Sequence, residues 1–382
     1  MHSNMPAFDR RVSEPIRVAR VLCIFFMIYV HVNPGFAEFD IPGHGIRAFD
    51  LFRFGLVNSV GRASVALLSA ISGYLAAHSL VRLGASKLMA RRFRSLIVPL
   101  AIWNAAFILL TVLGDHVRPG YLETALAGPL SLWRLPTLLV SAFAAPANVP
   151  LGFLRDTFVC AAMMPLLLVL LRRHIGFFLA AVVAIFLVAQ FVPLLITADL
   201  ILFFAIGIWC AERGRVPMAF PVPVLWMSAG LLIVLGAVVT SLQFTQFTDP
   251  TAERAVLIKA VFSTIRFPAA VIFWSASVWL SRQASGRWLS GLEPYMFMAF
   301  CTHMILLTPL WFVWQSVFGD YYGAAYPVFF ILAPFVVFAG AVMVAESLFA
   351  VSPALFGILN GGRLLDAAVR RPGSSTASMP TA

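Results

Sequence analysis

The sequence predicts an all-helical integral membrane protein, and three observations support this fold class. Of the 382 residues, 61% are hydrophobic and only 11% are charged, whereas about 25% of residues are charged in an ordinary soluble protein. The mean hydropathy is +0.93. The apolar residues also form ten runs of roughly 20 residues, the length at which a helix crosses a bilayer. A soluble fold cannot cover its outside with so few polar groups, so that class is excluded.

We expect each of the ten runs to form a membrane-spanning helix. They cover residues 16–34, 58–80, 95–113, 151–171, 175–193, 196–211, 222–242, 258–280, 293–317 and 325–350. The first has no small-residue cleavage site, so we interpret it as an uncleaved helix. The run at 196–211 is short, so it is either tilted or merged with its neighbour. Residues 124–145 are apolar but contain Pro129 and Pro136, which indicates an interfacial or re-entrant segment.

The predicted organisation is one membrane domain over residues 16–350 between two polar tails. Residues 1–15 form the N-terminal tail, and residues 351–382 form a C-terminal tail whose low-complexity sequence predicts disorder after about residue 362. Ten spans place both tails on one side, and that side collects 18 of the 27 basic residues. The positive-inside rule then places both termini in the cytoplasm. No internal repeat is visible, which disfavours a transporter built from repeated halves.

The net charge of +11 does not indicate nucleic-acid binding, because the charges are sparse and scattered between apolar runs. Only Lys87 and Lys259 are lysines, so nearly all the cations are guanidinium groups, which suit phosphate and carboxylate ligands. The four cysteines fall inside apolar runs and have neither disulfide nor metal-ligand spacing. We expect them to be small apolar packing residues, and we expect no metal site.

Two ionisable residues lie on the first predicted helix. Arg20 and His31 are eleven residues apart, which places them on one helical face about 16 Å apart along the axis. Ionisable groups inside a span are costly and indicate a function. Two alternatives remain open: an arginine that only sets topology by snorkelling, and an interfacial histidine bonded to a loop carbonyl.

The order and spacing of several stretches resemble acyltransferase family 3, integral membrane O-acyltransferases that modify surface polysaccharides. The resemblance covers about residues 16–350. It begins with arginine, ten residues and histidine on the first helix. It continues in SAISGYL (69–75), RRFRSLIVP (91–99), LGFLRDTF (151–158), FFAIGIW (203–209) and YMFMAFCTH (295–303). LGFLRDTF is most similar to the exopolysaccharide-modifying succinyl- and acetyltransferases of the succinoglycan type, although Gly152 replaces their usual tryptophan.

The resemblance implies acyl transfer to a sugar hydroxyl, for which His31 is the candidate base, because a neutral imidazole accepts protons near pH 7. A carboxylate that orients the other ring nitrogen makes a better base, and Asp156 lies at a similar predicted depth. We therefore expect His31, Asp156 and Arg20 to be catalytic. The alternative for Asp156 is an ion pair with the adjacent Arg155 or another buried cation.

The implied donor is acyl-CoA, carrying a succinyl or acetyl group, and we expect no permanently bound cofactor. Arg91, Arg92 and Arg94 precede the third span on the predicted cytoplasmic side and are expected to bind its phosphates. The family's basic pair is three residues apart, which fits Arg91 and Arg94, whereas the distance to Pro99 favours Arg92. The alternative for this cluster is topology plus contact with anionic lipid. Arg20 is a candidate for the thioester oxygen or a phosphate, and Arg155 for a succinyl carboxylate.

His303, ten residues after Glu293, is either a second site residue or a satisfied core histidine. Three more charged residues lie within or near spans and are expected to form structural ion pairs: Arg62, Arg266 and Glu346. The implied acceptor is an exopolysaccharide or its lipid-linked repeat unit, in the bacterial inner membrane. We expect direct transfer, because neither serine nor cysteine lies clearly beside His31. The rival function is a transporter or flippase of lipid-linked sugar, in which Arg20 and His31 would line a translocation path.

Overall fold

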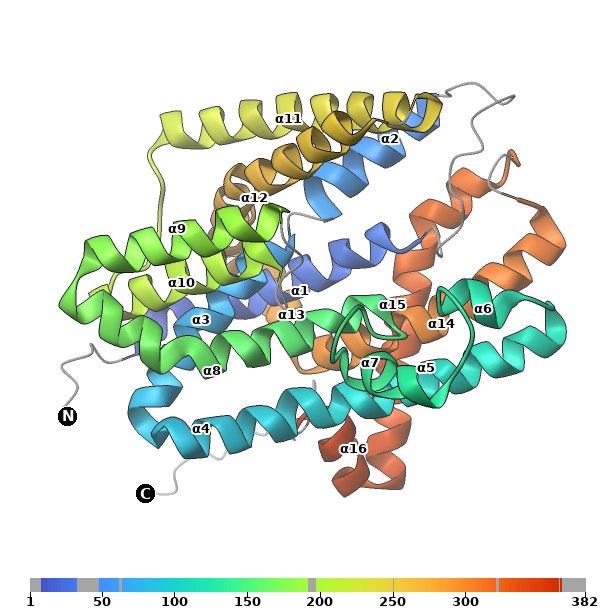
Figure 1. The fold of residues 1–382 in the computed structure, drawn as a ribbon, viewed down its shortest axis with the longest axis horizontal. Coiled ribbons are helices and arrows are strands. Elements are labelled where there is room, and N and C mark those ends of the chain that lie inside the picture. Colours follow the sequence, from blue (N-terminus) through green and yellow to red (C-terminus); the bar gives the residue numbers. More distant parts are fainter. Residues whose placement is uncertain are drawn as a thin grey trace, which may run out of the picture.

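The computed structural model describes residues 8–32, 48–61, 64–191, 197–249, 251–320, 323–363 and 365, and these residues form helices and no strand. The helices are α1 (Ser13–Val30), α2 (Ala48–Leu56), α3 (Ser64–Leu83), α4 (Ala85–Arg92), α5 (Val98–Val117), α6 (Tyr121–Ala125), α7 (Leu135–Val140), α8 (Gly152–Arg173), α9 (Ile175–Phe191), α10 (Ala198–Arg213), α11 (Val222–Thr248), α12 (Ala252–Ser281), α13 (Ala284–Leu292), α14 (Met296–Phe318), α15 (Tyr326–Val351) and α16 (Pro353–Leu359) (Figure 1). Two π-helical turns, η2 (Val57–Gly61) and η3 (Phe93–Ile97), precede α3 and α5, and a short 3-10 turn, η6 (Glu293–Tyr295), precedes α14.

The described residues of the ten predicted segments are mostly helical, and the chain is a multi-pass membrane protein. Within the described ranges, seven helical stretches are long and apolar enough to cross a membrane: Ala48–Leu83, Ala85–Val117, Val149–Arg173, Val222–Gln246, Ala252–Ser281, Ala284–Phe318 and Tyr326–Val351. The first predicted segment, α1, has 18 residues but carries Glu14, Arg17 and Arg20. The fifth and sixth, α9 and α10, have only 17 and 16 residues. The count of ten spans therefore stays a prediction.

The helix α1 lies inside the bundle, where it packs against α3, α12, α13, α14 and α15 (Figure 1). Most of its apolar residues are buried, as expected of a helix surrounded by other helices. Arg20, in the first half of α1, contacts η6, which precedes α14. His31, at the end of α1, contacts His303 within α14. The helices α1 and α14 therefore run in the same direction. The predicted topology requires this, because the first and ninth spans are both odd-numbered and cross the membrane in the same direction.

The helices α3 and α10 approach each other more closely than side chains allow. Gly73 of α3 lies against the carbonyl of Phe204, and Gly207 of α10 lies against the carbonyl of Ala70. A Cβ atom at either glycine would overlap the opposite backbone. Small residues at such contacts let membrane helices pack backbone to backbone. The stretches 69–75 and 203–209 therefore have a structural role, which is to hold these two helices together.

Residues 124–145 do not form a spanning helix. They contain only the end of α6, a 3-10 turn and α7, and they pack on α5 through a cluster that includes Phe107, Leu126 and Leu138. The C-terminal region also has structure beyond residue 351, because α16 packs on α5 and the Trp103 indole donates a hydrogen bond to the Leu359 carbonyl. The predicted disorder concerns residues that lie almost entirely outside the described part.

Candidate functional site

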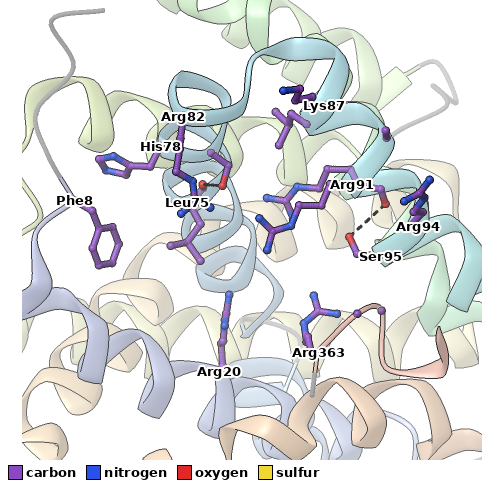
Figure 2. Close-up of a pocket in the computed structure, with 16 residues that line it drawn as sticks. Phe8, Arg20, Leu75, His78, Arg82, Lys87, Arg91, Arg94, Ser95 and Arg363 are labelled. Atoms are coloured by element: carbon purple, nitrogen blue, oxygen red, sulfur yellow. Dashed lines mark hydrogen bonds between the residues drawn. The ribbon is translucent and has the colours of Figure 1, made fainter. Parts of the chain in front are cut away.

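A cavity of about 850 Å³ lies at the beginning of α1, between α3, α4 and the residues after α16. Seven of its lining side chains are cations: Arg20, Arg82, Lys87, Arg91, Arg92, Arg94 and Arg363. None of the described lining residues is acidic. We call it the cation cavity. Arg20 and Arg363 point toward Arg91 from the opposite wall (Figure 2). The cavity thus brings together all four arginines that the sequence analysis assigned to the donor phosphates, namely Arg20, Arg91, Arg92 and Arg94.

Arg20 is held at this wall by an ion pair. Its Nη1 atom lies 2.5 Å from Oε1 of Glu293 in η6. The pair links the first predicted span to the ninth, so the orientation of the guanidinium group depends on the docking of α1 against η6. Both side chains keep some exposure, so the pair contributes more to geometry than to stability.

The π-helical turn η3 shapes the opposite wall. It comes directly after Arg91 and Arg92 and contains Arg94 and Ser95, which both line the cation cavity. A π turn inserts one extra residue into a helix and rotates the segment before it relative to the segment after it, and such turns occur often at functional sites. In this chain the turn lies between α4, which carries cations of the cavity, and the apolar helix α5, so the faces of the two helices point in different directions.

Arg363 is a site residue that the sequence analysis missed. Its guanidinium group lies over the Phe297 ring, 4.2 Å from the centroid, and donates to the Asn360 carbonyl. Gly361, whose φ is +63°, passes so close to the Ser95 carbonyl that a Cβ atom would lie only 2.5 Å from it. Burial, followed by the charge of Arg20, lowers the pKa of Arg363 to about 10. The only sequence signal was a lone arginine at the start of a segment predicted to be disordered.

At the other end of α1, His31 lies beside His303 of α14. The two ring centroids are 5.3 Å apart. His31 is the C-terminal cap of α1, and it lines a small pocket of about 180 Å³ together with Gly61, Phe153, Arg266 and other side chains. We call this the His31 pocket. His303 is fully buried and its Nδ1 bonds to the Phe300 carbonyl at 2.7 Å. Because a carbonyl only accepts, Nδ1 carries the proton and Nε2 is the acceptor nitrogen.

The predicted pairing of Asp156 with His31 is wrong. One Asp156 oxygen accepts from Nε of Arg155 at 2.7 Å, and the other accepts from the backbone N–H and the hydroxyl of Thr197. The alternative, an ion pair with Arg155, is the one found. The physical reason is that a long arginine side chain folds back onto the next residue of its own helix. Arg155 lines a different cavity from the cation cavity, and its assignment to a succinyl carboxylate stays a prediction.

The geometry supports a two-ended site built around α1. One end has a cavity whose described lining holds many cations and no acid, which suits a polyanionic phosphate group. The other end carries two imidazole rings in contact, which suit proton transfer near neutral pH. Of the sequence-predicted residues, the structure brings Arg20, Arg91, Arg92 and Arg94 together, and places His31 with His303 instead of Asp156.

Comparisons with known proteins agree with this architecture. A family described as an acyltransferase domain, acyltransferase family 3, matches residues 15–346. The chain is also 28% identical, over 369 residues, to the succinoglycan biosynthesis protein ExoH of Rhizobium meliloti (strain 1021), a match that covers 93% of this chain and 94% of that protein. No solved structure matches the chain significantly. Because the family match covers most of the sequence, the chain belongs to acyltransferase family 3 and is a membrane O-acyltransferase.

Proposed function

We propose that the protein moves a succinyl or acetyl group from acyl-CoA to a sugar hydroxyl of an exopolysaccharide, or of its lipid-linked repeat unit, in the bacterial inner membrane. The observation that carries this proposal is the position of the cation cavity and of His31 at opposite ends of α1. The acceptor class follows from the similarity to a succinoglycan biosynthesis protein. With the positive-inside orientation, both termini and the cation cavity face the cytoplasm, where acyl-CoA is made.

The separation of the two ends fits the shape of the donor. Eleven residues of helix between Arg20 and His31 correspond to about 16 Å. The pantetheine arm of CoA has a chain equivalent to between four and five extended residues, about 15 Å. Phosphates bound in the cation cavity therefore allow the thioester to reach the neighbourhood of His31.

Donor binding must displace side chains along this path. The cation cavity and the His31 pocket have no lining residue in common. Ile24 and Met27 are buried on α1 between Arg20 and His31. We infer that the pantetheine arm enters between α1 and its neighbours by moving such flexible apolar side chains, which costs less than moving backbone.

The transfer itself is assigned to His31 as general base. One ring nitrogen takes the proton from the sugar hydroxyl while its oxygen attacks the thioester carbonyl carbon. The C–S bond breaks, and the leaving CoA thiolate takes up the proton from His31. The described residues that line the His31 pocket include neither serine nor cysteine, which supports direct transfer. Trapping of an acyl-protein or burst kinetics would contradict it.

The test is His31→Ala in a producing strain, with mass spectrometry of the surface polysaccharide. Loss of the acyl group from polymer of normal yield supports the enzyme. Loss of polymer, with unchanged acylation of the remainder, supports the rival function of a lipid-linked sugar transporter. No change in either quantity would overturn the polysaccharide assignment and indicate a lipid or small-molecule acceptor instead.

A further inference from the structure

A second polar cavity, of about 330 Å³, lies at the end of the bundle away from the cation cavity. Its walls come from the first residues of α3, α8 and α10, from the middle of α12 and from the segment after α7. The helix α3 connects the two ends, because Val65 and Ser69 line this cavity while Leu75 and Arg82 line the cation cavity. We call this second cavity the polar pocket. Its volume is at the lower end of the range for small-ligand sites.

Two arginine–carboxylate pairs form the polar wall of this pocket. Arg155 pairs with Asp156, and Arg266 pairs with Asp199. Among the described lining residues, these four are the charged ones, so their formal charges cancel. The cation cavity has seven positive charges in its lining. The two cavities therefore select different ligands, because a neutral pocket rich in donors and acceptors does not favour a polyphosphate.

The carboxylate of Asp199, a lining residue of the polar pocket, has one oxygen that is covered by protein atoms and makes no hydrogen bond to the described residues. The Asp199 side chain is about nine-tenths buried, and its Oδ1 has no hydrogen-bond partner in the described part of the chain. A buried carboxylate oxygen without a donor costs free energy, which a ligand hydroxyl would recover. Asp156 differs, because both of its oxygens accept hydrogen bonds from protein groups.

The polar pocket adjoins the His31 pocket. Val65, Phe153 and Arg266 line both of them. A ligand in the polar pocket would therefore have one edge beside the Phe153 ring and next to the space in front of His31. A ring with several hydroxyls matches this surface, because it offers an apolar face to the aromatic ring and hydroxyl groups to the charged pairs.

We propose that the polar pocket binds one neutral sugar residue of the acceptor, with a ring hydroxyl donating to Oδ1 of Asp199 and another hydroxyl directed at His31. This proposal rests on the proposed function and adds the place where its second substrate binds. It also gives the Arg155–Asp156 pair a role, which is to form the wall of the acceptor site rather than to orient the base.

Val149 offers a direct way to fill the pocket. It lies in the lining and is 60% exposed, so a larger side chain there does not displace buried groups. Gly152 is less suitable, because tryptophan is the usual residue at that position in the enzymes that the stretch 151–158 resembles. The matched control is Gly230→Trp, because Gly230 is an exposed residue of α11 with nothing within 4 Å of an added Cβ atom.

The test uses the full-length protein in lipid nanodiscs, with succinyl-CoA as donor and p-nitrophenyl β-D-glucoside and β-D-galactoside as acceptor probes. We expect Val149→Trp to raise the KM for the glycoside about tenfold or more, with the affinity for CoA unchanged. Asp199→Asn should raise the same KM about tenfold, the effect of one hydrogen bond to a charged group. Gly230→Trp should leave both quantities at wild-type values.

Three results would overturn the proposal in different ways. An unchanged glycoside KM in folded Val149→Trp protein shows that the sugar binds elsewhere. Equal weakening of glycoside and CoA binding shows a general structural effect. Failure of the wild-type protein to acylate either glycoside or the polysaccharide of its own host overturns the proposed function itself. If Asp199→Asn does not fold, Val149→Trp alone decides between these results.

Discussion

The rings of His31 and His303 lie in contact, 5.3 Å apart between centroids, at one end of a helix pair that the Arg20–Glu293 ion pair joins at the other end. The spacing is eleven residues along α1 and ten along η6 and α14. Two parallel helices thus carry matched polar contacts, one beside the cation cavity and one beside the His31 pocket. This arrangement makes the position of each end depend on the same helix–helix contact.

His303 is expected to position His31. Its Nδ1–H is fixed by the Phe300 carbonyl, so Nε2 remains an acceptor in the buried interior. We expect His303→Phe to lower kcat by about tenfold to a hundredfold, within the range of general-base effects, with the KM for acyl-CoA unchanged. His303→Gln, which keeps an acceptor, should recover part of the rate. Initial rates at saturating donor measure this, and wild-type kcat in His303→Phe would reduce His303 to a packing residue.

The cation cavity is expected to bind CoA in a salt-dependent manner. Arg91→Ala and Arg92→Ala should each weaken CoA binding several-fold, because each removes a charge-assisted contact to phosphate, and the loss should shrink as salt screens the cavity. The control is Arg172→Ala, since Arg172 pairs with Glu212 and does not line the cavity. Equilibrium binding of CoA at two salt concentrations measures the effect. Equal losses in the control would assign it to overall charge.

Arg363 is expected to lower the free energy of unfolding while it contributes to binding of the donor. Burial and the charge of Arg20 lower its pKa to about 10 from 12.5, so the folded state binds this proton less tightly than the unfolded chain does. The charged group therefore lowers stability at every pH below about 10, and the penalty disappears as the pH rises from there. Arg363→Gln should raise the free energy of unfolding, because it removes this charge, and it should weaken CoA binding. Thermal unfolding with and without CoA tests both, and a lower melting temperature without CoA would contradict the argument.

The sequence was sufficient for features that depend on one segment at a time. Apolar runs predicted every long helix, because burying a helix in lipid requires about 20 apolar residues. The grouping of Arg20 with Arg91, Arg92 and Arg94 followed from the predicted topology. All four residues are predicted on the same side of the membrane, and therefore at the same end of the helix bundle. Lys87, four residues before Arg91, also lines the cavity.

Features that depend on which helices are neighbours could not be predicted. His303 was recognised as a candidate, yet nothing in its spacing placed it beside His31 rather than in an ordinary core. Asp156 was assigned to His31 from depth alone, but depth does not fix the direction of a side chain around its helix. The stretches 69–75 and 203–209 were identified as family-like, but only the structure shows that Gly73 and Gly207 are the contact between α3 and α10.

The glycine contact between α3 and α10 is expected to be a main determinant of stability. Gly73→Ala and Gly207→Ala each introduce a methyl group where backbone already lies, and the two helices must move apart. Overpacking of this kind costs about 2–3 kcal/mol or more when backbone has to shift. Because α3 lines both the cation cavity and the polar pocket, the same shift should weaken CoA and acceptor binding together. The control is Gly230→Ala, where an added Cβ meets nothing within 4 Å. Thermal unfolding of the three variants in nanodiscs measures the difference, and equal melting temperatures for Gly73→Ala and Gly230→Ala would show that the helices do not depend on this close approach.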